Sequence, residues 1–212
     1  MSKFVQSPIV ILLFILGLTS CSDNKVHEAL SNFPYAGVGG IDTQNQGKAL
    51  FTSCASCHMP NGSGRVDGTI PNLAGRKKTI LSGKLTQIKM SEKWLPVMAP
   101  FAKALSSNQI ELIAFYLSTL EPPKNIGQGP IKDPSLGQKI YLNLCIDCHL
   151  LDEMPQITGQ HFRYIQRKIR EFKTMPEELS PMITIAKELS EKEITEVASY
   201  LSAQKSPKGS EK

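Results

Sequence analysis

Residues 54–58, Cys-Ala-Ser-Cys-His, and residues 145–149, Cys-Ile-Asp-Cys-His, are the two stretches that decide the fold. A C-x-x-C spacing places two thiols on adjacent turns, where they can bind zinc, form a redox disulfide or add to the two vinyl groups of one haem. The histidine after each second cysteine favours haem, because it can become the fifth ligand of the iron. Zinc would leave both histidines unexplained, and thioredoxin-like chemistry would need strands. The sequence therefore predicts two covalently attached haem c groups, held by Cys54, Cys57 and His58 and by Cys145, Cys148 and His149.

The rest of the chain is an internal duplication. The stretch Pro-Asn-Leu-Ala-Gly-Arg at 71–76 aligns with Pro-Gln-Ile-Thr-Gly-Gln at 155–160, and this offset of 84 residues persists without a gap beyond Tyr200. The cysteine stretches pair at an offset of 91, so the first copy carries an insertion between its histidine and its proline. A duplication on this scale predicts two units of the same fold.

Each copy has the periodicity of helices. Apolar residues recur at spacings of three and four, Ser106 and Ser190 stand where N-caps belong, and no alternating strand pattern of useful length appears. The sequence therefore predicts an all-α protein built of two small domains in tandem, each wrapped around one haem. The expected helices cover 79–90 and 106–117, 162–173 and 190–201, with a further helix in each copy leading from Gly47 or Gly137 into the cysteine stretch.

Composition excludes several classes of protein. The chain has 212 residues, of which 41% are hydrophobic and 20% charged, so wholesale disorder is excluded. The net charge of +5 is scattered, which gives no support to nucleic-acid binding. Aromatic residues make up only 7%, so two small domains would have thin cores, and domains of that kind usually need a covalent staple or a cofactor for stability.

The N-terminus has the features of a secretory signal peptide. Lys3 precedes an apolar run over residues 9–18, which is shorter than the roughly 20 residues that span a membrane; an uncleaved transmembrane helix is the alternative. The ending Leu-Thr-Ser-Cys at 18–21 resembles the lipobox of bacterial lipoproteins. We therefore expect export to the periplasm and a lipid anchor on Cys21.

Composition shifts along the chain predict the domain boundaries. The region between the two copies is rich in proline and glycine and has no helical period, which is typical of a linker. The expected organisation is a signal peptide at 1–20, a lipidated cysteine and flexible tether at 21–45, a first domain at 46–121, a linker at 122–135, a second domain at 136–205 and a C-terminal tail at 206–212.

The duplication also selects a sixth ligand for each iron. Met98 and Met182 are the methionine pair in register, whereas Met90 faces Thr174 and Met175 faces Ser91. A thioether suits haem iron, and core filling is the alternative role. Pro71 and Pro155 are also in register. The carbonyl of each would accept a hydrogen bond from the ring N–H of the axial histidine in its repeat, or each proline simply stiffens its loop.

Charge divides unequally between the two copies. Residues 42–121 hold nine basic and five acidic residues, whereas residues 132–206 hold ten basic and eleven acidic ones. We therefore expect the first domain to dock an acidic partner through lysines such as Lys77 and Lys78.

Together these motifs resemble the class I cytochromes c, and specifically the tandem di-haem type, cytochrome c4, over residues 42–204. The resemblance rests on Gly-Lys-Ala at 47–49, the paired proline loops, the two Met-x-x-x-Ala-x-x-Leu-Ser stretches and the terminal Ala-x-Tyr-Leu segments. It implies that His58 with Met98 and His149 with Met182 are the axial pairs.

The same resemblance implies a non-catalytic electron carrier, because both irons would have six ligands. A quinol-oxidising complex or a dehydrogenase would supply the electrons, and a terminal oxidase of the respiratory chain would accept them. The alternative functions are a cytochrome subunit of a dehydrogenase, or a di-haem redox enzyme such as a peroxidase or an enzyme of sulfur-compound oxidation.

Overall fold

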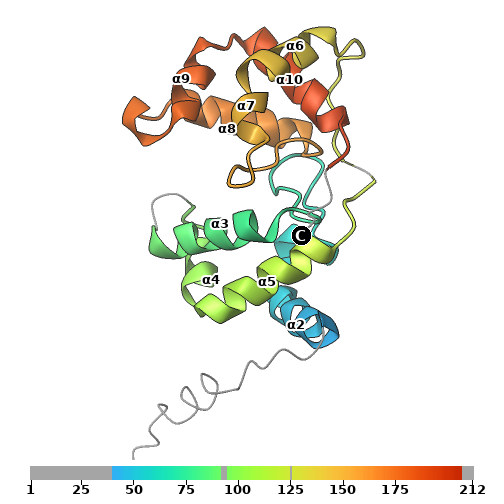
Figure 1. Ribbon diagram of the computed structural model, residues 1–212, viewed down its shortest axis with the longest axis vertical. Helices are drawn as coiled ribbons and strands as arrows, with labels where there is room; N and C mark the ends of the chain where they lie inside the picture. The colour runs from blue at the N-terminus through green and yellow to red at the C-terminus, as the bar shows by residue number, and fades with distance from the viewer. Residues whose placement is uncertain (1–39, 92–94, 125, 207–212) are drawn as a thin grey trace, which may run out of the picture. The chain divides into compact units, whose positions relative to one another are not determined.

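The computed structural model describes residues 40–91, 95–124 and 126–206, all of which belong to one unit, Gly39–Lys212. The expected signal peptide, Cys21, and most of the expected tether and tail lie outside the described residues. Every regular element among the described residues is helical, which confirms the all-α class (Figure 1). No helix within these residues is both long enough and apolar enough to cross a bilayer.

The helices follow the duplication. The first repeat contains α2 (Gly40–His58), α3 (Lys78–Met90), α4 (Ala99–Lys103) and α5 (Ser107–Thr119), and the second contains α6 (Ser135–Leu144), α7 (Ile146–His149), α8 (Phe162–Lys173), η1 (Glu177–Leu179), α9 (Pro181–Glu188) and α10 (Glu191–Ala203). Helix α10 begins and ends 84 residues after α5, and α8 begins 84 residues after α3. The sequence offset is therefore also the structural offset.

Both expected N-caps are confirmed. The hydroxyl of Ser106 accepts from the amide of Gln109 at 3.2 Å, and the Gln109 side chain accepts from the Ser106 amide at 2.8 Å. Ser190 and Glu193 make the same reciprocal pair at the start of α10. Such capping boxes satisfy backbone donors that the first turn of a helix leaves free.

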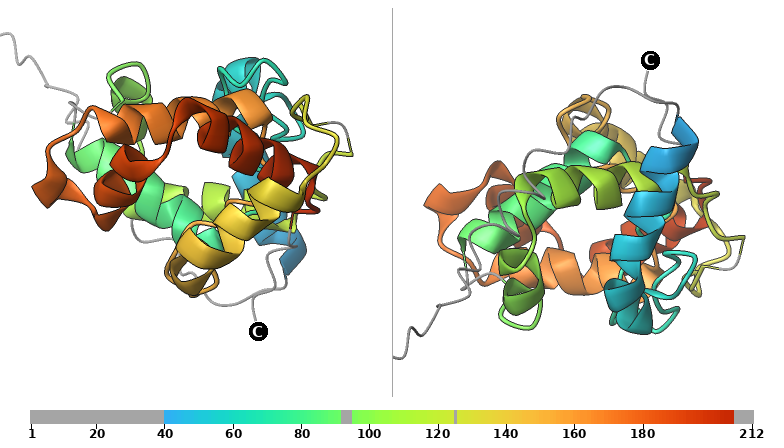
Figure 2. Two further views of the ribbon diagram at one scale, coloured as in Figure 1. Left: turned by 90° about the horizontal axis from the view of Figure 1, so that it is seen from above. Right: turned by 90° about the horizontal axis from the view of Figure 1, so that it is seen from below.

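Each repeat is held together by packing of its first helix against its last, and the right view of Figure 2 shows α2 in blue crossing α5 in green. The α2 and α5 backbones approach closely at Gly47, and beside this point the rings of Phe51 and Tyr116 lie 5.8 Å apart. The rings of Tyr141 and Tyr200, on α6 and α10, lie 5.6 Å apart at the equivalent place. The aromatic residues therefore belong to the packed core around each attachment helix.

Three features differ from the expectations. Helix α2 begins at Gly40, so residues 40–45 are helical rather than part of the tether; Asp42 lies in the first turn, where a negative charge is favoured. The attachment segment of the second repeat is divided into α6 and α7 at Cys145. Helices α4 and α9 were not expected, because segments this short show little periodicity.

The described residues of the proline- and glycine-rich connection between the repeats form no helix, but they make specific contacts with the second repeat. The amide of Gly127 donates to Nδ1 of His161 at 3.1 Å, and the amide of Gly129 donates to the hydroxyl of Ser202 at 3.1 Å. This segment therefore has a defined course over α8 and α10.

Candidate functional site

The four cysteines of the two attachment stretches are free thiols near the ends of their helices. Cys54 and Cys145 are half-buried, whereas Cys57 and Cys148 are exposed. Burial raises the pKa of the Cys145 thiol to about 11. Each site thus presents one shielded and one accessible thiol about a helical turn apart, which fits addition to two vinyl groups on one porphyrin edge.

The histidine after each pair of thiols lies at the end of its helix. His58 is 6% exposed, and its Nδ1 is buried without a hydrogen-bond partner. Burial lowers the pKa of His58, and the nearby carbonyl of Pro71 opposes that shift. A buried imidazole with unused ring nitrogen fits an iron ligand, because the neutral ring is the form that binds metal.

In the second repeat, Nδ1 of His149 lies 2.8 Å from the carbonyl oxygen of Pro155. A ring N–H donated to this carbonyl would fix the tautomer and leave Nε2 to coordinate the iron. The same arrangement of histidine and proline carbonyl thus recurs in both repeats, with the closer contact in the second.

The two methionines in register occupy equivalent short helices. Met98 is the N-cap residue of α4 and packs against a small buried cluster of Ile88, Ala99 and Ala102. Met182 lies in the first turn of α9 and is half-buried, with its amide donating to the Ser180 hydroxyl at 3.3 Å. Met90, by contrast, is 79% exposed at the end of α3.

The two proline loops contact each other directly, which the sequence did not indicate. Arg76, Asn72 and Gln160 are buried in this contact and hydrogen-bond from one loop to the other. These residues stand in the duplicated motif, but alignment shows only that two positions are equivalent, not that they meet.

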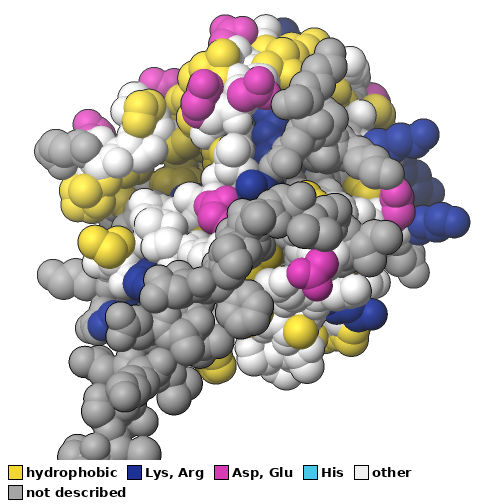
Figure 3. Space-filling model, turned by 60° about the horizontal axis from the view of Figure 1, so that its bottom comes forward, with side chains coloured by type: hydrophobic (Ala, Val, Ile, Leu, Met, Phe, Trp, Pro, Cys, Tyr) yellow, Lys and Arg dark blue, Asp and Glu magenta, His cyan; other side chains and the backbone are white. Residues whose placement is uncertain are grey.

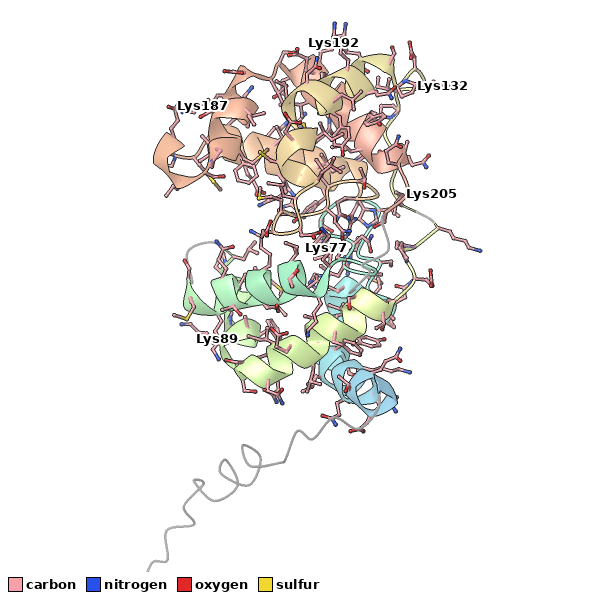
Figure 4. The ribbon with its side chains drawn as sticks, viewed as in Figure 1. Lys77, Lys89, Lys132, Lys187, Lys192 and Lys205 are labelled. Carbon is pink, nitrogen blue, oxygen red and sulfur yellow. The ribbon has the colours of Figure 1, made fainter. Side chains whose placement is uncertain are left out.

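Lys77 and Lys78 do not form the freely exposed docking face that the charge division suggested. Lys77, labelled between the repeats in Figure 4, pairs with Asp152 of the second repeat at 2.7 Å. Lys78 pairs with Glu111 at 3.4 Å. On the face shown in Figure 3, basic and acidic side chains are interspersed, with several basic ones gathered at one edge.

His161 is a second buried histidine, 1% exposed, directly before α8. Its Nδ1 accepts from the Gly127 amide, so Nε2 must carry the proton, which it donates to the Ser63 carbonyl at 2.8 Å. This imidazole joins the first repeat, the connecting segment and the second repeat only while it is neutral, because a protonated Nδ1 cannot accept from Gly127.

We expect His161 to make stability depend on pH. Burial lowers its pKa, the Ser63 carbonyl raises it, and the charges of Arg76 and Asp67 act in opposite directions, with a net lowering from 6.5. A lowered pKa favours the neutral ring, so its contribution is complete above about pH 6.5 and is lost as pH falls through the folded-state pKa, at up to about 1.4 kcal/mol per pH unit. Urea unfolding of the holoprotein from pH 7.5 to 5 measures this slope.

The matched variant is His161→Asn, which cannot take up a proton and should flatten that slope. His27→Gln, which changes a histidine outside the described residues, should leave the slope as it is. A parent slope unchanged by His161→Asn would show that another group is responsible.

Comparison with known proteins agrees with this geometry. Residues 44–121 match the family described as cytochrome c. The chain is 28% identical to the thiosulfate dehydrogenase electron acceptor of Thiomonas intermedia (strain K12) over 72% of this chain and 78% of that protein. It is 31% identical to the cytochrome subunit of sulfide dehydrogenase of Chlorobaculum tepidum over 37% of this chain and 69% of that protein.

Among solved structures, reduced recombinant cytochrome c4 from Pseudomonas stutzeri superposes with a TM-score of 0.60 at 26% identity, over 75% of this chain and 97% of that one. The fold is that of two tandem class I cytochrome c domains, which bind haem c covalently. This protein therefore belongs to the cytochrome c family, as a di-haem electron carrier similar to cytochrome c4.

Proposed function

We propose that this protein is a periplasmic, membrane-anchored cytochrome that carries single electrons between respiratory complexes, toward a terminal oxidase, and is not itself an enzyme. The observation that supports the proposal is that both repeats carry the same candidate ligands. Each has two thiols and a histidine at the end of its attachment segment, and a methionine in register at the start of a short helix. Two irons with all six positions taken leave no site for a substrate.

In this proposal the cysteines attach each haem, His58 and Met98 bind the first iron, and His149 and Met182 bind the second. The bound haem supplies one-electron chemistry. Pro71 and Pro155 supply the carbonyls that orient the two imidazole rings. A thioether ligand favours the ferrous state and so gives both centres relatively high reduction potentials.

A second candidate is a cytochrome subunit or dedicated acceptor of a dehydrogenase that oxidises sulfur compounds. The relatives named as a thiosulfate dehydrogenase electron acceptor and as a cytochrome subunit of sulfide dehydrogenase favour it. This candidate changes the electron donor and leaves the role of the two repeats the same.

Electron transfer to native membranes tests the first candidate. Holoprotein reduced beforehand and mixed with membranes of the source organism should be reoxidised by oxygen, and cyanide should block this reoxidation. Membranes from a strain without terminal oxidases serve as the control. Membranes that fail to reoxidise the protein would contradict the oxidase proposal. Rapid reduction by a periplasmic extract supplied with thiosulfate or sulfide, together with co-purification of a dehydrogenase subunit, would favour the second candidate.

The proposed lipid anchor gives a separate prediction. Cys21→Ser removes the sulfur to which the acyl chain would attach, so the holoprotein should move from the membrane fraction to the soluble periplasm. Immunoblots of the two fractions measure the shift, with Cys21→Ala expected to behave alike. Full retention in the membrane would instead indicate an uncleaved N-terminal helix.

A further inference from the structure

The two proline loops, residues 71–76 and 155–160, contact each other through reciprocal but unequal groups. The amide of Asn72 donates to Oε1 of Gln160 at 2.8 Å, and Nε2 of Gln160 donates back to the Asn72 carbonyl at 3.0 Å. Arg76 stands at the position of the duplicate that Gln160 holds in the second repeat. One loop thus contributes a neutral amide to this contact and the other a cation.

Arg76 lies inside the contact, with 5% of its surface exposed. Its Nη1 donates to the carbonyls of Gln156 at 3.0 Å and Thr158 at 2.8 Å, and its Nη2 donates to the Gly159 carbonyl at 2.7 Å. Nε is buried without a partner, and the three acceptors that the guanidinium contacts are uncharged backbone carbonyls. Burial lowers the pKa of Arg76 to about 10, so the group stays charged at neutral pH.

The carbonyls that Arg76 binds belong to the segment that begins at Pro155. This proline carbonyl is the one that lies 2.8 Å from Nδ1 of His149. A residue of the first repeat therefore holds, from three points, the loop that orients the proposed axial histidine of the second.

We propose that Arg76 is a positioning residue of the first repeat that acts on the second haem, holding the loop behind His149 and raising the reduction potential of that haem. The ferric state carries one more positive charge than the ferrous state. A fixed, desolvated cation nearby therefore disfavours oxidation, and it does so far more strongly than an exposed lysine screened by water. Gln160, at the equivalent position of the second repeat, brings no charge to this contact.

The proposal rests on the ligand roles proposed above, and spectroelectrochemical titration of the intact holoprotein tests it. Arg76→Gln gives the first repeat the glutamine that the second repeat has at the equivalent position, Gln160. This variant should lower the equilibrium constant for one-electron reduction of the second haem about tenfold, which is a fall of about 59 mV in its reduction potential. Lys48→Gln removes an exposed positive charge of the first repeat and should shift neither potential comparably.

Assignment of the two potentials comes from Met182→His, since replacing the thioether by imidazole lowers the potential of the second haem alone. If Met182→His moves neither potential, the ligand assignment is overturned and this inference with it. If it moves one potential while Arg76→Gln moves none, or moves only the other, the role of Arg76 alone is overturned.

Arg76→Lys separates charge from structure and decides the matter even where Arg76→Gln does not assemble with both haems. At neutral pH this variant keeps the cation, so the second potential should stay near that of the parent. The same burial depresses the pKa of the new amine, and the second potential should fall as pH rises through it, while the parent stays flat over that range. If the second haem of Arg76→Lys has a low reduction potential at neutral pH that does not change with pH, the charge of Arg76 has no role and the residue only holds the loop in place.

Discussion

Met182→Ala should open one of the two irons to carbon monoxide while the other stays closed. If Met182 binds the second iron as proposed, alanine cannot replace it and the sixth position becomes free for a small ligand, whereas the iron proposed to bind Met98 keeps all its ligands. The reduced holoprotein should bind one carbon monoxide per two haems, measured by the difference spectrum against total haem. Met98→Ala should give the same stoichiometry, and the double variant should bind two.

The chain provides a matched control for this experiment. Met90→Ala changes a methionine of the same repeat as Met98 that is out of register and exposed, so it should bind no carbon monoxide. Binding in Met90→Ala but not in Met98→Ala would show that the duplication selects the wrong ligand.

Gly47→Ala and Gly137→Ala should each disrupt the repeat that contains them. A Cβ at Gly47 would lie 2.3 Å from the Leu112 carbonyl oxygen and 2.6 Å from Cβ of Tyr116; at Gly137 the Glu196 carbonyl oxygen would be 2.3 Å away. Backbone oxygen cannot move aside by changing a rotamer, so the crossing helices must separate. We expect a loss of about 3 kcal/mol in the free energy of unfolding, measured by denaturant titration of the holoprotein.

Gly83→Ala is the control, because nothing lies within 4 Å of a Cβ built on this glycine of α3. Alanine is the better helix former, so this variant should be more stable by roughly 0.5 to 1 kcal/mol. Unfolding midpoints that coincide for Gly47→Ala and Gly83→Ala would mean that the α2–α5 crossing is looser than the structure indicates.

The sequence predicted those parts of the fold that depend on local signals. The periodicity and caps of Ser106 and Ser190 placed α5 and α10, and their bounds agree with the structure to within a few residues. The short helix α4 has too few residues for a period. The break at Cys145, where φ is −120° and ψ is −39°, has no counterpart in the first repeat, so the duplication could not indicate it.

The candidate site likewise has features that depend on local sequence and features that depend on tertiary contacts. Ligand types and spacing are local, so the two attachment stretches could be read directly. The burial of Arg76 and the tie that His161 makes to Ser63 and Gly127 depend on how two loops far apart in sequence come together. A basic residue in a repeat is usually solvated, and no pattern of the sequence distinguishes Arg76 from Lys77 and Lys78, which follow it.

The contacts of Gly127 and Gly129 with the second repeat make the connecting segment help to hold the two proline loops together. The connecting segment is short and is bound to the second repeat. It therefore keeps each proline loop at a high effective concentration around the other, of the millimolar order typical of short connections. The polar contact between the loops can then be weak as a bimolecular association and still persist within one chain. Severing the backbone near the exposed Lys124 would remove this advantage, and two separate one-haem fragments would drift apart at micromolar concentration.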